Sequence, residues 1–175
     1  MKKLLLVLMF VFTTTLSFAS IGIKGGYSKG AGDSSDYSGI ALGVDYMLNL
    51  GPIYIGPEIM YTNWSFERTI FATTWEYSTN DIQLNANALF KTPLGIYIGA
   101  GLGLNFLQST IKAGSSENKG DRKAYVGFQG ILGFELGLPG LPIKPFIEGR
   151  YQIITSDNDS TANYIYIMGG INIDF

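Results

Sequence analysis

The sequence predicts an all-β protein: an eight-stranded antiparallel up-and-down transmembrane β-barrel, preceded by a cleavable signal peptide. Three observations lead to this fold class. The chain has 175 residues, enough for one domain, and is 46% hydrophobic but only 15% charged, against about 25% charged residues in soluble domains. Apolar and polar residues alternate with period two in one segment after another. The first residues have the order of an export signal.

The composition excludes several classes of function. The chain contains neither Cys nor His, so disulfides, thiolate and imidazole metal ligands and histidine-dependent catalytic triads are absent. The formal net charge is -2, so no basic face indicates nucleic-acid binding. We therefore expect no enzyme activity, no cofactor and no metal.

The N-terminus predicts a signal peptide over residues 1–19. Lys2 and Lys3 precede nine apolar residues, and the small-residue sequence Ser17-Phe18-Ala19 follows. This order is typical of a secretory signal cut after Ala19, and the apolar run is too short to span a bilayer as a helix. Residues 20–175 would then form the barrel.

Eight later segments alternate with period two, as strands with two unlike faces do. In the segment 95–108, apolar residues occupy every even position from Ile96 to Phe106, and glycines or polar residues fill most of the odd ones. Eight strands leave about 20 residues for each strand and its connection, enough for the 9–11 residues of a tilted membrane strand. The expected strands are 21–29, 38–49, 52–66, 80–91, 95–108, 123–138, 142–154 and 164–175.

The connections between these segments are of two kinds. Residues 49–52, 92–95 and 139–142 are tight turns that contain Pro or Gly, and the other connections are longer and mostly polar. Short turns at one end and long loops at the other are typical of an up-and-down membrane barrel. The expected long loops are 30–37, 67–79, 111–122 and 155–163.

The charges of the strands distinguish a membrane barrel from a soluble, lipocalin-like carrier with a charged exterior. In the strand bodies the charged residues share the face opposite the apolar one, with many glycines beside them. A charge on a lipid-facing wall costs about 2 to 4 kcal/mol, so this distribution favours a membrane barrel with a charged lumen. The predicted lumen charges are Lys24, Asp45, Glu58, Lys91, Glu135, Lys144, Glu148, Arg150 and Asp174.

Aromatic residues on the apolar face fall near the two ends of the strands. Two rings of aromatic side chains are typical of the interfaces of a membrane barrel. The predicted girdles are Tyr46, Phe90 and Phe175 near the short turns, and Tyr61, Phe106, Phe128 and Tyr151 near the long loops.

On these features the sequence resembles the small outer-membrane barrels of the OmpA and OmpX type. The resemblance depends on the signal peptide, the Pro57-Glu58 step, the run 146–151 and the alternating strand that ends at Phe175. It implies that the insertion machinery of the outer membrane reads Phe175. The partners implied are this machinery and outer-membrane lipid and lipopolysaccharide, with the protein a monomer in the outer membrane.

Within the lumen we expect the charges to pair. Symmetric connections would place Glu135 opposite Lys144, and Lys24 opposite Asp45. The planar fork of Arg150 could hold Glu58 or Glu148 with two hydrogen bonds. Eight strands enclose a lumen that side chains can fill, which favours a plug over an ion path or gate.

Two prolines and some weaker motifs complete the analysis. Pro57 and Pro145 lie inside strands, where each lacks a ladder donor, and we expect local bulges there. The glycines of 99–103 share one strand face, unlike those of a nucleotide-binding loop. Asp157-Asn158-Asp159 could contact a divalent cation, although other ligands of a calcium loop are absent. The aromatic residues Trp64, Phe66, Phe71 and Trp75 fit an extended hairpin packed on itself, an interfacial belt or a contact surface for a ligand.

The function expected from the sequence is structural support of the envelope or surface interaction through the long loops, without enzyme activity. A narrow or gated pore for small solutes is the alternative. A soluble periplasmic carrier comes next, and a lipid A hydrolase or acyltransferase last, because the barrel enzymes of that kind rely on histidine.

Overall fold

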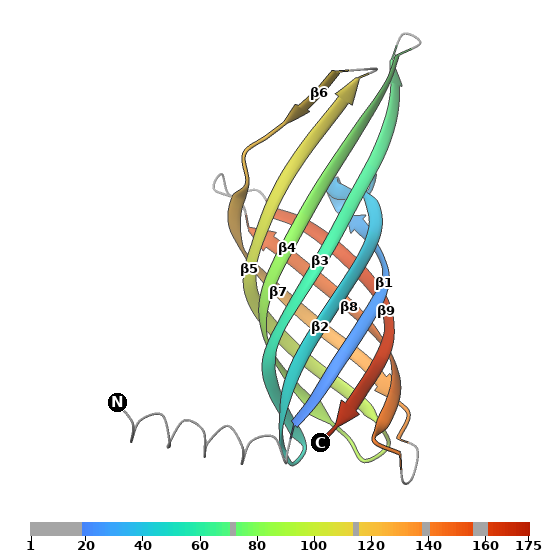
Figure 1. The fold of residues 1–175 in the computed structure, drawn as a ribbon, viewed down its shortest axis with the longest axis vertical. Helices are drawn as coiled ribbons and strands as arrows, with labels where there is room; N and C mark the ends of the chain where they lie inside the picture. Colours follow the sequence, from blue (N-terminus) through green and yellow to red (C-terminus); the bar gives the residue numbers. More distant parts are fainter. Residues whose placement is uncertain (1–18, 71–72, 114–115, 138–140, 156–160) are drawn as a thin grey trace, which may run out of the picture.

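Antiparallel neighbours follow one another along the chain, and the pairing of β1 with β9 closes the sheet into a barrel (Figure 1). This computed structural model describes residues 19–70, 73–113, 116–137, 141–155 and 161–175. Within those residues no helix is long and apolar enough to cross a membrane. The elements are β1 (Ala19–Ala31), η1 (Gly32–Ser34), β2 (Ser38–Leu50), β3 (Ile53–Ile70), β4 (Thr73–Lys91), β5 (Ile96–Ala113), β6 (Ser116–Lys119), β7 (Lys123–Glu135), β8 (Ile143–Thr155) and β9 (Thr161–Asp174).

The barrel wall has eight strand positions, because the short strand β6 and the longer β7 both pair with β5. Between the two pairings, residues 120–122 stand opposite Gln108 and Ser109, so this strand carries one extra residue. The amide of Gly120 donates to the carbonyl of Ser109 at 2.9 Å. This bulge separates the membrane part of the strand from its outer extension.

The ladders are staggered around the barrel. A path across paired residues leaves β1 at Ala19 and returns to β1 at Lys29, ten residues further along. With eight strands this stagger tilts the strands by about 40° from the barrel axis. Such a barrel encloses a space just wide enough for side chains to fill.

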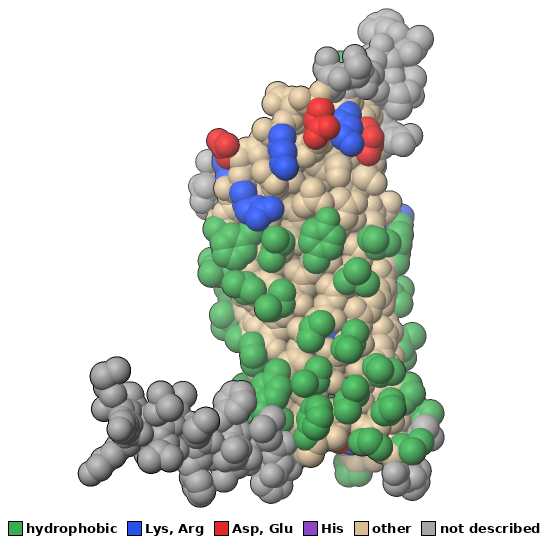
Figure 2. Space-filling model, in the orientation of Figure 1, with side chains coloured by type: hydrophobic (Ala, Val, Ile, Leu, Met, Phe, Trp, Pro, Cys, Tyr) green, Lys and Arg blue, Asp and Glu red, His purple; other side chains and the backbone are tan. Residues whose placement is uncertain are grey.

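The apolar face of the strands points outward, as the sequence predicts. Ile96, Leu104 and Ile171 have 48%, 46% and 38% of their surface exposed, whereas the buried side chains include many polar and charged ones. Figure 2 shows hydrophobic side chains over the wall and charged ones gathered towards the end with the long hairpins. A soluble carrier with a charged exterior would show the reverse, so the membrane barrel is confirmed and the lipocalin-like alternative is wrong.

Two connections that the sequence analysis assigns to long loops are largely strand. β3 and β4 stay paired up to Ile70 and Thr73, and β5 extends to Ala113. These extensions rise beyond the other strands (Figure 1). Thr and aromatic residues favour strands, but outside the membrane the wall pattern of apolar and polar faces is no longer required. The expectation of loops at 67–79 and 111–122 is therefore wrong.

The interpretation of the aromatic segment as a hairpin packed on itself is confirmed where it is described. Phe66 stacks on Tyr77 with ring centroids 4.6 Å apart, and Tyr37 meets Phe66 edge-on at 4.7 Å. Burial raises the pKa of the Tyr37 phenol above its ordinary value. Phe71 lies outside the described residues.

The bulges expected at the two prolines are absent from the described ladders. On both sides of Pro57 the register between β2 and β3 is the same, and only the pairs of Tyr46 and Met47 are interrupted. Pro145 pairs with Ile171 of β9, and its carbonyl accepts from the amide of Leu136 at 2.8 Å. Each ring thus stands where a strand lacks a ladder partner for the missing N–H, so no extra residue is needed.

Candidate functional site in the barrel lumen

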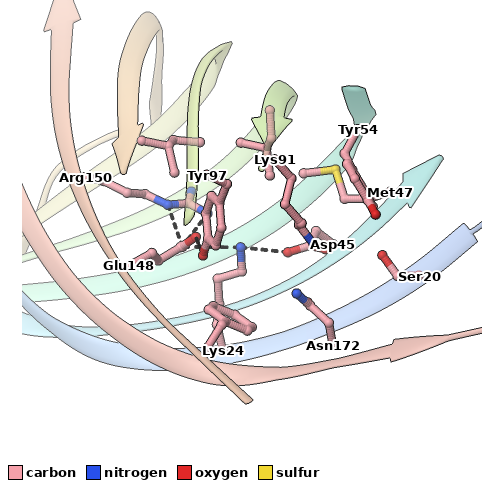
Figure 3. A pocket seen from close by; sticks show the side chains of 13 residues that line it. Ser20, Lys24, Asp45, Met47, Tyr54, Lys91, Tyr97, Glu148, Arg150 and Asn172 are labelled. Carbon is pink, nitrogen blue, oxygen red and sulfur yellow. Dashed lines mark hydrogen bonds and ion pairs between the residues drawn. The ribbon is translucent and has the colours of Figure 1, made fainter. Parts of the chain in front are cut away.

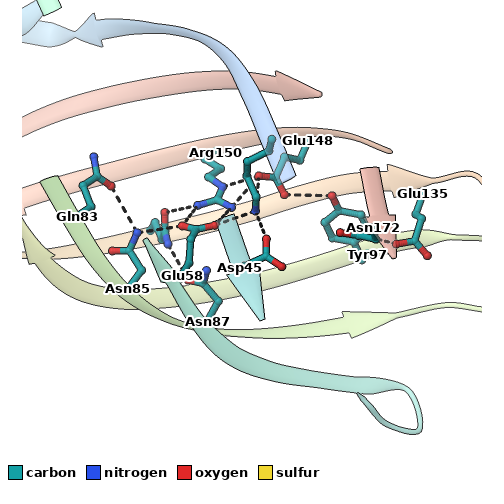
Figure 4. Close-up of polar contacts among 12 residues, drawn as sticks. Asp45, Glu58, Gln83, Asn85, Asn87, Tyr97, Glu135, Glu148, Arg150 and Asn172 are labelled. Atoms are coloured by element: carbon teal, nitrogen blue, oxygen red, sulfur yellow. Dashed lines mark hydrogen bonds and ion pairs between the residues drawn. The ribbon is translucent and has the colours of Figure 1, made fainter. Parts of the chain in front are cut away.

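The centre of the lumen holds five buried charged side chains from four strands (Figure 4). Nη1 and Nη2 of Arg150 each lie 2.6 Å from one carboxylate oxygen of Glu58, which makes a bidentate pair. Nε of Arg150 donates to Glu148 at 2.8 Å. Nζ of Lys24 lies 2.6 Å from Asp45 and 2.8 Å from Glu58. The network therefore connects β1, β2, β3 and β8 across the lumen.

Inward positions alternate along each strand, so every second residue can reach this cluster. The barrel stagger then brings together residues far apart in sequence, such as Arg150 and Glu58, which are 92 positions apart. Charge-assisted bidentate bonds of this kind are the stronger ones. Both acids facing Arg150 were candidates in the sequence analysis, and the guanidinium contacts both of them.

The first expected cross-strand pair meets diagonally. Lys24 stands opposite Gly43, and Asp45 stands opposite Gly22, two residues from the symmetric register. A methyl group on Gly22 would lie 2.6 Å from the Asp45 carboxylate, so the glycine leaves the space that the carboxylate occupies. The symmetric first loop was the wrong assumption, because η1 and the residues after it make the connection asymmetric.

A second cluster lies at the end with the short turns. Nζ of Lys91 is 2.8 Å from Glu135, and Lys144 forms an ion pair with Asp174. Glu135 stands opposite Phe146 and not opposite Lys144 as expected, although Nζ of Lys144 still lies 4.0 Å from Glu135. The assumed symmetric turn was again the source of the error.

Between the two clusters is a cavity of about 20 Å³ (Figure 3), room for one water molecule. Lys24, Asp45, Tyr97 and Glu148 line it together with residues of the lower cluster. The Tyr97 hydroxyl donates to Glu148 at 3.1 Å. Side chains therefore fill the lumen at this level.

Above the central cluster lies a layer of amide side chains. Nδ2 of Asn85 donates to Glu58 at 3.0 Å, and Nε2 of Gln129 donates to Asn87 at 2.7 Å. Nε2 of Gln152 donates to Oδ1 of Asn105 at 3.0 Å. These bonds join β3, β4, β5, β7 and β8, so the polar network crosses the barrel at a second level.

Sequence reasoning missed Asp81, whose surface is 0% exposed. Its carboxylate accepts from Nε2 of Gln83 at 2.8 Å, while Oδ1 has no protein partner. Asp81 has the same parity as Gln83 and Asn85, so the alternation of this segment could have identified it. Among the described residues the lumen then holds six acids and four cations, not five and four.

The upper end of the lumen is closed by larger side chains. The rings of Trp64 and Tyr164 stack at 4.1 Å, and Met60 and Met168 pack in the same buried cluster. Tyr166 donates to Oε1 of Gln152 at 2.7 Å. An aromatic and methionine layer thus separates the polar lumen from the outer hairpins.

The remaining candidate residues lie on the wall or outside the described part. The seven predicted girdle aromatics face outward, as do Tyr27 and Phe134, which were not predicted. The glycines of 99–103 lie on β5, where a methyl group on Gly101 would meet Asn87 at 2.0 Å. Asp157-Asn158-Asp159 lies outside the described residues. In the described ranges no group of three or more acidic, His or Cys side chains is arranged to hold a metal ion.

Solved structures with the same architecture were found by comparison. Neisserial surface protein A matches with a TM-score of 0.60 and 12% identity over 90% of this chain and 97% of that one. Ail, the attachment invasion locus protein of Yersinia pestis, matches with a TM-score of 0.59 and 13% identity over 90% and 99%. The N-terminal barrel domain of Pseudomonas aeruginosa OprF matches with 0.53 and 12% over 88% and 97%.

No family model matches the sequence, and no curated protein matches it. At these identities the structural likeness shows the fold. Together with the apolar outer wall and the polar lumen, the architecture gives this chain the fold and the outer-membrane location of the small eight-stranded outer-membrane β-barrels.

Proposed function

We propose that this protein is a non-enzymatic anchor in the outer membrane, whose closed barrel presents the extended hairpins for contacts at the cell surface. The observation that carries the proposal is the side-chain network that crosses the lumen at several levels. An open channel would need these layers to part.

The closed lumen is supported by the packing of its charges. The central cluster combines two cations with three carboxylates, and Arg150 and Glu58 are both almost completely buried. Breaking one such buried pair costs about 3 to 5 kcal/mol. Solute passage would have to separate these pairs, which favours a plug over a steady pore.

The surface role is supported by the length of the outer strands. β3, β4 and β5 contain 18, 19 and 18 residues, whereas β1 and β2 contain 13 each. Five more residues lengthen a strand by about 16 Å. Beyond Phe66, β3 has pairings only with β4 among the described residues, which leaves an edge for another chain. Ail, which has a similar fold, is named for attachment and invasion.

Two measurements test this proposal. Planar-bilayer recordings of the purified barrel should show no large steady single-channel currents, and such currents would refute the plug. Because the chain has no cysteine, single cysteines can report orientation. A membrane-impermeant maleimide should label K112C on whole cells but not L94C in a short turn, and the reverse labelling would refute the outer position of the hairpins.

The alternative is a narrow or gated pore. The six lumen acids outnumber the four cations, and Lys144 and Asp174 at the short-turn end retain 25% and 35% of their side-chain surface exposed. A pore with this lining would favour cations. Liposome swelling with small solutes distinguishes it from the plugged barrel.

We also propose that residues 1–19 are removed during export and that the barrel is a monomer inserted through the strand ending at Phe175. Residues 1–18 lie outside the described part of the chain. Intact-mass measurement of the protein from outer membranes should give a chain that begins at Ser20. A mass that includes the first 19 residues would contradict the signal peptide.

A further inference from the structure

The lipid-facing wall carries a basic residue that the sealed-anchor role does not use. Lys29 lies near the outer end of β1 and is exposed, while its neighbours Ser28 and Gly30 are buried, so its side chain points away from the lumen. None of the ion pairs in the described part of the chain includes Lys29. Tyr27, an outward aromatic, lies two residues below it. A cation at this depth can reach the headgroup region.

An apolar groove of about 540 Å³ lies on the outer face of β7, β8 and β9. Gly130 and Gly149 form its floor, and its walls include Leu132, Tyr151 and Ile167. A methyl group on Gly130 would meet nothing within 4 Å, and one on Gly149 would first meet a backbone oxygen at 3.9 Å. Packing within the barrel therefore does not require these glycines.

Lys29 and the groove belong to one row of paired residues. Lys29 stands opposite Ile165, Ile165 opposite Tyr151, and Tyr151 opposite Gly130. Neighbouring strands are about 4.8 Å apart, so the backbones of Lys29 and Tyr151 are separated by about 10 Å. Because the strands tilt, the row descends from the outer rim at Lys29 towards the middle of the wall at Gly130.

We propose that this surface, the Lys29 groove, binds one phosphate-bearing glycolipid of the outer leaflet. A phosphate of the headgroup pairs with the Lys29 ammonium, and one acyl chain fills the groove over Gly130 and Gly149. The charge of Lys29 selects an anion, and the apolar walls below it select hydrocarbon. The assignment to the outer leaflet rests on the proposed function, in which the long hairpins lie outside the cell.

Native mass spectrometry of the folded barrel in detergent tests this site, with lipid A, dephosphorylated lipid A and phosphatidylglycerol as separate probes. K29Q should reduce the retention of lipid A about fivefold, as expected for one basic residue at a charged headgroup. K29R should keep it. G149L, which fills the groove, should reduce the retention of both forms of lipid A. K112Q and A86L replace an exposed cation and an outward alanine elsewhere and should behave like the wild type.

Three results would overturn the proposal: unchanged lipid A retention in K29Q, equal loss in the K112Q and A86L controls, or phosphatidylglycerol retained as strongly as lipid A. A shift in gel migration on heating verifies that each variant is folded. G130V replaces G149L if the bulkier side chain prevents folding. A negative result leaves the bilayer recordings and the cysteine labelling unaffected, so the two proposals fail separately.

Discussion

Replacing Arg150 by methionine tests whether the lumen network holds the barrel together. The guanidinium makes charge-assisted contacts of 2.6 to 2.8 Å with Glu58 and Glu148, and donates to Gln129 at 3.1 Å. R150M removes one of two cations from a cluster with three carboxylates, so its formal charge changes from -1 to -2 within the membrane. Only Lys24 then balances the buried acids.

The expected loss of unfolding free energy is about 3 to 5 kcal/mol, the cost of leaving a buried charge unpaired. Urea titration of the barrel in lipid vesicles, followed by the fluorescence of Trp64 and Trp75, measures it. With a slope of about 2 kcal/mol per molar urea, a loss of about 4 kcal/mol lowers the midpoint by about 2 M. K112M, which removes an exposed cation, should change the midpoint little.

The double variant E58M/R150M separates the pair from its surroundings. It returns the cluster to a formal charge of -1, so its loss should be smaller than the sum of the two single losses by at least about 2 kcal/mol. A loss below about 1 kcal/mol in R150M would refute the reasoning, and so would strict additivity in the double variant. Either result would mean that water or relaxation already compensates these charges.

Two further predictions concern glycines and the lipid face. G133A should destabilise the barrel by about 1 to 3 kcal/mol, because its methyl group would lie 2.2 Å from the Tyr97 ring. G130A on the same strand has open space and should be neutral or slightly stabilising; equal effects in the same urea assay would contradict the assigned faces. L102R should cost about 2 to 4 kcal/mol in vesicles, since Leu102 is exposed on the wall. I111R, on the extension outside the membrane, should cost little, and similar losses at both sites would argue against the membrane boundary.

The sequence was most informative where one face of a strand meets lipid and the other meets the lumen. Segments such as 95–108 and 164–175 contain this contrast at every second residue, so their strands and outward faces could be predicted. Beyond the membrane the contrast disappears, and 67–79 was expected to be a loop although it is mainly strand. Asp81 lies at the same boundary, in the segment where alternation starts, and was left out of the predicted lumen charges.

The contacts of the lumen needed the tertiary structure. Parity places Lys24, Asp45, Glu58 and Arg150 inside, but the contacts among them depend on the stagger around eight strands. The expected opposite pairs were each displaced by two residues, because connection length does not determine register when a loop contains its own turn.

The sequence by itself determined the barrel class, the outward apolar face and the polarity of the interior, because each follows from local alternation and from the cost of placing charge in lipid. The tertiary structure alone decided which charges meet, how far the outer strands extend and where the wall is hollowed beneath Lys29. These features depend on ladder register and stagger, which sum small offsets from every hairpin around the closed barrel.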